Sequence, residues 1–178
     1  MKKIVYRYGW YAALFELIFF ILAWLIFGLA KVQDPALQGN LGWVCIICPM
    51  IFVYFGIRYY RDNVNGGTIT LLKALQVGLL IVIIPTLSYA LIETVYVIYL
   101  DPHFYERIMS NEADLYRKTL SPAAFSAKVK EMKEHMAVYK NPLYNFMAMV
   151  LMIGALGTIV AVISSFILWR KQPKAVLA

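Results

Sequence analysis

Two acidic residues, Glu16 and Glu93, stand inside long apolar stretches of the sequence. A carboxylate is costly in hydrocarbon, so an acid within a membrane span is by default a candidate for proton or ion binding. A helix starting at Trp10 places Glu16 ~9 Å from its first residue, at 1.5 Å per residue. Glu93 lies ~10 Å from the far end of its own stretch. We therefore expect no carboxylate pair: Glu16 contacts a polar group or base near one surface, and Glu93 a tyrosine or asparagine near the other.

Cys45 and Cys48 form a CxxC pair that is followed by Pro49. Thiols at this spacing lie on one face of a helix and can act as a redox pair. The setting resembles the bacterial quinone-linked disulfide oxidases, which are four-span proteins with such a pair near the outer end of the second span. Those enzymes also need a cysteine pair in their long outer loop, and residues 101–142 contain no cysteine. Plain packing of a small apolar residue is the alternative.

Arg58 and Arg61 precede a turn signal at Gly66-Gly67. Arginines three residues apart share one side of a helix, so this pair is a candidate for binding lipid phosphates at the inner leaflet. The alternative is ordinary charge that sets the topology. The two glycines predict a tight turn, after which Thr68 or Thr70 can cap the next helix.

The elements that must position these residues are long apolar helices. The chain of 178 residues is 62% hydrophobic, with a mean hydropathy of +0.67, whereas a soluble domain is about half apolar. Four blocks are long enough to cross ~30 Å of hydrocarbon, at residues 10–30, 41–59, 71–100 and 143–169. Pro49 is expected to bend the second span. Small residues share one face of the last span and allow close helix packing: Gly154, Thr158, Ala161 and Ser165. We expect one membrane domain over residues 1–178.

The segment 101–142 is polar and predicts a helical hairpin outside the membrane. Asp101-Pro102 either ends the third span or begins a new helix with Asp101 as its cap. Ser121-Pro122 divides the segment into two arms. The second arm carries an apolar stripe at heptad spacing: Phe125, Val129, Met132, Met136 and Tyr139. We expect this stripe to pack on the first arm, through Phe104, Ile108 and Leu115, rather than to dock a protein partner or a second copy.

The basic residues predict the orientation. With both termini on one side, that side carries nine basic residues against a single acid, Asp62: Lys2, Lys3, Arg7, Arg58, Arg61, Lys73, Arg170, Lys171 and Lys174. The positive-inside rule then places both termini in the cytoplasm and the hairpin outside. The same rule explains the net charge of +7 without any nucleic-acid partner, and the lipid bilayer is the expected surrounding.

Several short segments together resemble a known family: residues 55–62, 66–70, 73–75 with Gly78, Asp101-Pro102, Ser121-Pro122 and Asn141-Pro142. The family is bacterial, mostly from Bacteroidota, and consists of four-span membrane proteins known only as a domain of unknown function. Its members often have Phe where this chain has Leu71. The resemblance implies a four-span protein of the bacterial inner membrane, but it implies no activity.

The leading function class from the sequence is a non-enzymatic scaffold or accessory subunit of a membrane complex. The second is a small proton-coupled transporter using Glu16, because a lone acid in the first of four spans resembles the small multidrug transporters. Those proteins are shorter and have minimal loops. The third is a membrane thiol-redox protein using Cys45 and Cys48. The sequence contains no phosphate loop, no dinucleotide fingerprint and no metal motif around His103 or His135, so we expect no cofactor and no metal.

Overall fold

The computed structural model describes residues 1–26, the backbone of 35–40, and residues 41–169. The described part is helical and contains no β-strand, which confirms the all-α fold. The α-helices are α1 (Lys2–Trp24), α2 (Pro35–Ile47), α3 (Ile51–Asn63), α4 (Leu71–Val95), α5 (Phe104–Thr119), α6 (Pro122–Tyr139) and α7 (Pro142–Leu168). A 3₁₀ turn, η2 (Cys48–Met50), joins α2 to α3, and a π-helical turn, η3 (Tyr96–Leu100), extends α4.

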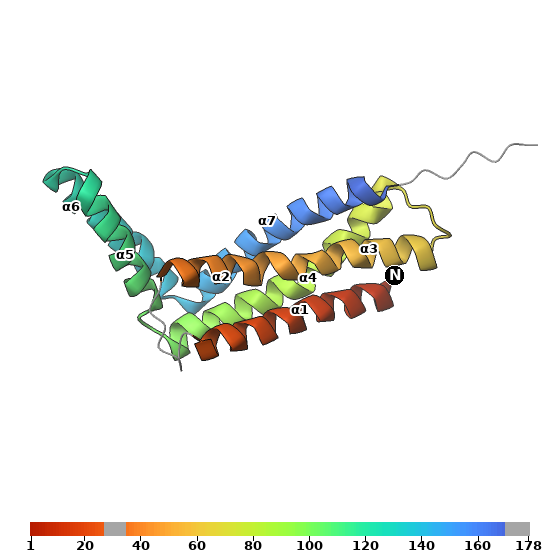
Figure 1. Ribbon diagram of the computed structural model, residues 1–178, viewed down its shortest axis with the longest axis horizontal. Helices are drawn as coiled ribbons and strands as arrows, with labels where there is room; N and C mark the ends of the chain where they lie inside the picture. The colour runs from red at the N-terminus through yellow and green to blue at the C-terminus, as the bar shows by residue number, and fades with distance from the viewer. Residues whose placement is uncertain (27–34, 170–178) are drawn as a thin grey trace, which may run out of the picture.

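Four helical stretches are long and apolar enough to cross a membrane: Lys2–Trp24, Leu41–Asn63, Leu71–Leu100 and Pro142–Leu168. They run side by side in one bundle, and the hairpin of α5 and α6 stands at the end opposite the N-terminus (Figure 1). Large apolar side chains face outward along these helices, among them Leu72, Leu143 and Leu151. Such a surface suits hydrocarbon and would be unusual in water. The chain is therefore a membrane protein with four candidate spans.

The helices of the first two spans begin earlier than expected, although the second candidate span itself starts at the expected Leu41. The helix α1 begins at Lys2 rather than Trp10, because residues 2–9 contain no proline and continue the same helix. The expected end of this helix at Ala30, and the loop that follows it, fall on residues 27–34, outside the described residues. The helix α2 begins at Pro35, where proline suits the first turn of a helix.

The two prolines within the spans have different effects. Pro49 lies in the 3₁₀ turn that separates α2 from α3, as expected for a residue that removes an N–H donor and crowds the preceding turn. Pro85 lies inside α4, which continues through it. The interrupted span therefore changes its helical phase near Cys48, which affects which side chains face the bundle.

The contact between α4 and α7 is made by small residues. Gly157 of α7 lies against the side chain of Val82, and Gly78 of α4 lies against Ala161. Ala161 and Ser165 are fully buried, as the expected small-residue face requires. Thr158 is instead exposed and donates to the carbonyl of Gly154 in its own helix, at 2.8 Å. The face of α7 that contacts α4 therefore includes Gly157 in place of Thr158.

The hairpin has the two arms that the sequence predicts. The Ser121 hydroxyl accepts a hydrogen bond from the Ala124 N–H and caps α6. The stripe on α6 is its least exposed side, with Met132 buried and Phe125, Val129, Met136 and Tyr139 half-buried. It packs against α5: the ring of Tyr139 lies 5.6 Å from that of Tyr105.

Two details of the first arm differ from expectation. Leu115 is 65% exposed and does not join the seam, whereas Tyr116 is half-buried there. Asp101 does not cap α5, which begins at Phe104 after His103. The Asp101 carboxylate instead forms an ion pair with Arg107 and accepts a hydrogen bond from the Tyr96 hydroxyl. These ionic contacts compete with the capping geometry and hold the start of the hairpin against the end of the third span.

Candidate functional site

A cavity of about 130 Å³ lies between α1, α2 and α4 near the hairpin end of the bundle. Its lining is mostly apolar and aromatic, and two carboxyl groups face it. The lining residues are Glu16, Phe20, Ala23, Trp24, Leu41, Gly42, Cys45, Tyr89, Ile92, Glu93, Tyr96, Val97 and Phe104. Phe104 comes from the first turn of α5, so the hairpin contributes to the wall. Apolar walls with a few convergent polar groups are typical of small-molecule sites.

Glu16 is the most unusual residue of this cavity. Its side chain is 2% exposed, and neither carboxyl oxygen has a hydrogen-bond partner among the residues that the structure describes. Burying a polar group without a partner costs free energy, and a persistent exception calls for a ligand, an ion or a proton at that place. Glu16 therefore marks the cavity as a candidate binding site.

Only one of the two carboxyl oxygens of Glu93 has a hydrogen-bond partner among the described residues. Its Oε1 accepts a hydrogen bond from the Tyr105 hydroxyl at 2.8 Å, the tyrosine partner that the sequence predicts. Its Oε2 is buried and has no partner among the described residues. Burial, and then the neighbouring Glu93 carboxyl, raise the pKa of Tyr105 above its usual range, so this hydroxyl stays protonated and remains a donor.

A buried asparagine connects this contact to the last span. The Asn145 amide of α7 donates to the Tyr105 hydroxyl at 2.7 Å, and its carbonyl oxygen accepts from the Thr94 hydroxyl at 2.9 Å. Asn145 is fully buried. The chain of hydrogen bonds links α4, α5 and α7 and fixes one oxygen of Glu93. Asn145 was not among the expected site residues, although an amide inside an apolar span is a detectable signal.

The two acids line one cavity, contrary to the expectation that they lie at different depths. Because α1 begins at Lys2, Glu16 is not close to its start. It lies eight residues before Trp24, ~12 Å from that end, and Glu93 lies seven residues before Leu100, ~10 Å from that end. The depth estimate from the sequence failed because it assumed the wrong first residue of the helix.

The cysteines lie in different surroundings. Cys45 is buried in the cavity wall, whereas Cys48 is exposed on the surface of the bundle, and both are free thiols. Cys48 is the first residue of the 3₁₀ turn η2, directly after the end of α2. Of the two thiols, Cys45 alone lines the cavity, and their action as a redox pair stays a prediction.

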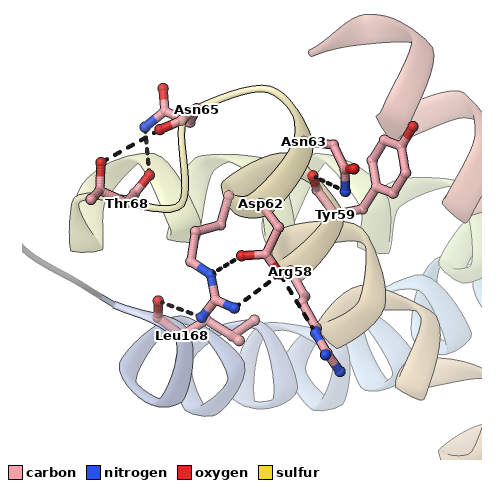
Figure 2. Close-up of polar contacts among 8 residues, drawn as sticks. Arg58, Tyr59, Asp62, Asn63, Asn65, Thr68 and Leu168 are labelled. Atoms are coloured by element: carbon pink, nitrogen blue, oxygen red, sulfur yellow. Dashed lines mark hydrogen bonds and ion pairs between the residues drawn. The ribbon is translucent and has the colours of Figure 1, made fainter.

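Arg58 and Arg61, which precede the glycine turn, make different contacts, and Figure 2 shows Arg58 beside Asp62. The side chain of Arg61 is 9% exposed, and it donates to both carboxylate oxygens of Asp62, at 2.6 and 3.0 Å. It also donates to the carbonyl of Leu168 at the end of α7, at 3.5 Å. Arg58 is 55% exposed and lies 3.6 Å from Asp62. The structure thus gives Arg61 a partner in another span and leaves Arg58 on the surface.

The turn after α3 is built by its glycines. Gly66 and Gly67 have φ values of 66° and 80°, a region that favours glycine, and no neighbouring atom restricts their space. The Thr70 hydroxyl then accepts from the Lys73 N–H at 3.3 Å and caps α4. Backbone conformation explains both glycines without a ligand.

The histidines of the hairpin take part in local contacts. His103 Nδ1 lies 2.8 Å from Glu106 Oε2, and the His135 ring packs against that of Tyr139. No three metal-ligating side chains come together to hold a metal ion in the part of the chain that the structure describes.

The comparisons with known proteins bear on the whole chain. Residues 7–170 match the family model described as "Protein of unknown function (DUF4199)". No curated protein and no solved structure matches the chain.

Proposed function

The chain belongs to the DUF4199 family, whose function is unknown, and we propose from its own geometry that it is a small non-enzymatic transporter that exchanges a proton at Glu16. The observation that carries this proposal is the unpartnered, buried carboxyl group of Glu16 on the wall of an intramembrane cavity. Proton carriers in membranes are built from acids in such places.

The physical argument is one of charge compensation. An ionised carboxyl in a low-dielectric site has to be paired with a cation, whereas a protonated carboxyl needs none. Glu16 therefore holds a proton or a cation at a given moment, not both. Mutually exclusive occupancy of one group is what couples proton movement to the movement of a solute in the opposite direction.

The proposal includes an orientation, with the protein in the bacterial inner membrane and both termini in the cytoplasm. Lys2, Arg58 and Lys73 lie at or near the ends of helices at the bundle end opposite the hairpin (Figure 1). Basic residues at this end are favoured on the cytoplasmic side. The cavity then lies in the outer half of the membrane, beneath an extracytoplasmic hairpin.

The test is infrared difference spectroscopy of the protein in lipid nanodiscs, titrated over roughly pH 5 to 10. A carboxyl C=O band should appear or disappear with pH in the wild type and should be lost in Glu16→Gln. The matched control is Glu112→Gln, which alters an exposed acid of the hairpin and should leave the band in place. A Glu16 carboxyl that does not titrate anywhere in this range contradicts proton exchange.

A scaffold or accessory subunit is the second candidate, and the projecting hairpin favours it (Figure 1). The stripe of α6 already packs on α5, so a partner or second copy would contact the outer side of the hairpin. A photo-crosslinker at Leu115 or Val138, which are 65% and 43% exposed, should then capture one reproducible protein. The same probe at buried Met132 should capture none, and equal labelling at all three positions counts against a docking surface.

A further inference from the structure

We propose that the cavity binds a compact primary ammonium ion carried on an aromatic or apolar body no larger than a benzene ring. The inference rests on the proposed function in one respect, the assignment of Glu16 as the exchanging group. It adds the chemical class of the solute.

The acceptor atoms of the cavity match the donors of a primary ammonium. Three buried carboxyl oxygens lack partners among the described residues: Glu16 Oε1, Glu16 Oε2 and Glu93 Oε2. A primary ammonium carries three N–H donors, as lysine does, and no acceptor. A quaternary ammonium carries no N–H donor, so it would leave all three oxygens without a hydrogen bond. A metal ion would require at least three His, Cys, Asp or Glu side chains close together, and no such group occurs among the described residues.

The remaining wall suits the body of such an ion. The rings of Phe20 and Tyr96 lie edge to face at 5.2 Å, and the rings of Tyr96 and Phe104 at 5.6 Å. All three line the cavity. Aromatic faces attract cations and pack edge to face with a further ring. The hydroxyl of Tyr96 donates a hydrogen bond to Asp101, a residue that does not line the cavity, so this hydroxyl does not need a partner in the solute.

The volume limits the size of the solute. The cavity measures about 130 Å³, and an apolar protein cavity of about 150 Å³ accommodates benzene. The cavity is partly open, so a small alkylammonium fits inside it and the ring of a benzylammonium ion extends to its mouth, whereas a multi-ring cation would lie mostly outside.

The charges predict the stoichiometry. Two carboxyl groups line the cavity, and a single monovalent cation balances the charge of only one of them in a low-dielectric site. Neutrality is reached when one carboxyl is ionised and the other remains protonated. Binding of one ammonium ion to the fully protonated site should therefore release one proton.

The experiment uses isothermal titration calorimetry on the full chain in phosphatidylcholine nanodiscs, a lipid that lacks a primary ammonium. Benzylammonium is the probe, and benzyl alcohol, its neutral analogue, is the control. Benzylammonium should bind the wild type at least about tenfold more tightly, a difference of ~1.4 kcal/mol. Titrations in buffers of different ionisation enthalpy should show about one proton released per ion bound.

Variants then locate the binding. Glu16→Gln should weaken benzylammonium binding by at least about tenfold and leave benzyl alcohol binding unchanged, which also shows that this variant is folded. Glu112→Gln should change neither. Nanodiscs that contain phosphatidylethanolamine should weaken benzylammonium binding if the ammonium of a lipid headgroup is the natural occupant, and should not if the solute is a free amine. Either result is consistent with the primary-ammonium class.

The outcomes separate the two proposals. Equal affinity for benzylammonium and benzyl alcohol overturns the ammonium class, even where Glu16 titrates and proton exchange stands. Preferred binding of benzylammonium without proton release supports the ammonium class and contradicts proton exchange.

Discussion

Arg58 and Arg61 show how differently two identical side chains of one helix can be used. Arg61 is buried, donates to both carboxylate oxygens of Asp62 and donates to the carbonyl of Leu168. A basic group near the last carbonyls of a helix satisfies an acceptor and interacts favourably with the helix dipole. Arg61 thereby joins α3 to the end of α7. Arg58 makes one exposed ion pair within its own helix, and such pairs contribute little.

This difference predicts unequal stability effects. Arg61→Ala should lower the free energy of unfolding by about 1–3 kcal/mol, because a charged hydrogen bond to another span is lost. Arg58→Ala, the matched control, should change it by less than about 1 kcal/mol. Denaturant unfolding in detergent micelles, followed by tryptophan fluorescence, measures both. Equal losses in the two variants would mean that the contact with Leu168 contributes nothing.

At the scale of elements, α4 and α7 approach closely where glycine meets a branched side chain. A Cβ at Gly157 would press on Val82, whose Cβ would lie 3.3 Å away. Valine is stiff about its first side-chain torsion and cannot turn aside easily. A Cβ at Gly154, one turn earlier on α7, would find its nearest neighbour, Thr86 Cγ2, at an ordinary 3.8 Å.

The same substitution should therefore have opposite consequences at the two positions. Gly157→Ala should destabilise the bundle by about 1–3 kcal/mol through overpacking. Gly154→Ala should be neutral or stabilise the helix by up to about 1 kcal/mol, since alanine is the better helix former. Thermal unfolding in the same detergent compares them. If Gly157→Ala unfolds at the wild-type temperature, the helices can separate locally and the contact is less rigid than we infer.

For the whole molecule, ionic contacts hold the hairpin at the end of the bundle. Asp101 follows the third span and pairs with Arg107 of α5, and Glu106 of α5 pairs with Lys140 after α6 at 2.9 Å. The hydrogen bond from Arg107 is the main reason why the pKa of Asp101 is lowered. Hydrogen bonds from His103 and then Lys140 lower the pKa of Glu106 to about 2.

These shifts predict how the hairpin responds to acid. A carboxyl whose pKa is lowered by folding stabilises the fold above its ordinary pKa and loses that effect as the pH falls through the lowered value. The base of the hairpin should therefore be intact at about pH 5 and open progressively toward pH 2. Amide hydrogen exchange of residues 104–119, corrected for intrinsic rates, measures the opening.

Two lysine variants are the controls for this response. Lys140→Gln removes the contact between the arms and should make exchange at the base faster at pH 5. Lys130→Gln removes a contact with Glu134 within α6 and should not. A hairpin whose exchange is insensitive to pH in the wild type would show that apolar packing alone holds the arms together.

The sequence by itself determined the all-α fold, the four spans and the hairpin between the third and fourth. These features follow from local physics: hydrocarbon requires long apolar helices with internally satisfied backbone groups, and caps such as Ser121 mark where the polar arms begin. The turn at Gly66-Gly67 is equally local, since its backbone angles suit glycine alone.

Only the tertiary structure decided which side chains meet. Glu16 and Glu93 share a cavity because α1 begins eight residues earlier than its apolar run suggests, which changes the depth of every residue in it. Cys45 is buried in the cavity wall, whereas Cys48 is exposed, a difference that the CxxC spacing does not reveal. Depth and rotation of a helix are set by its packing against neighbours, such as Gly157 against Val82, and hydrophobicity alone does not encode them.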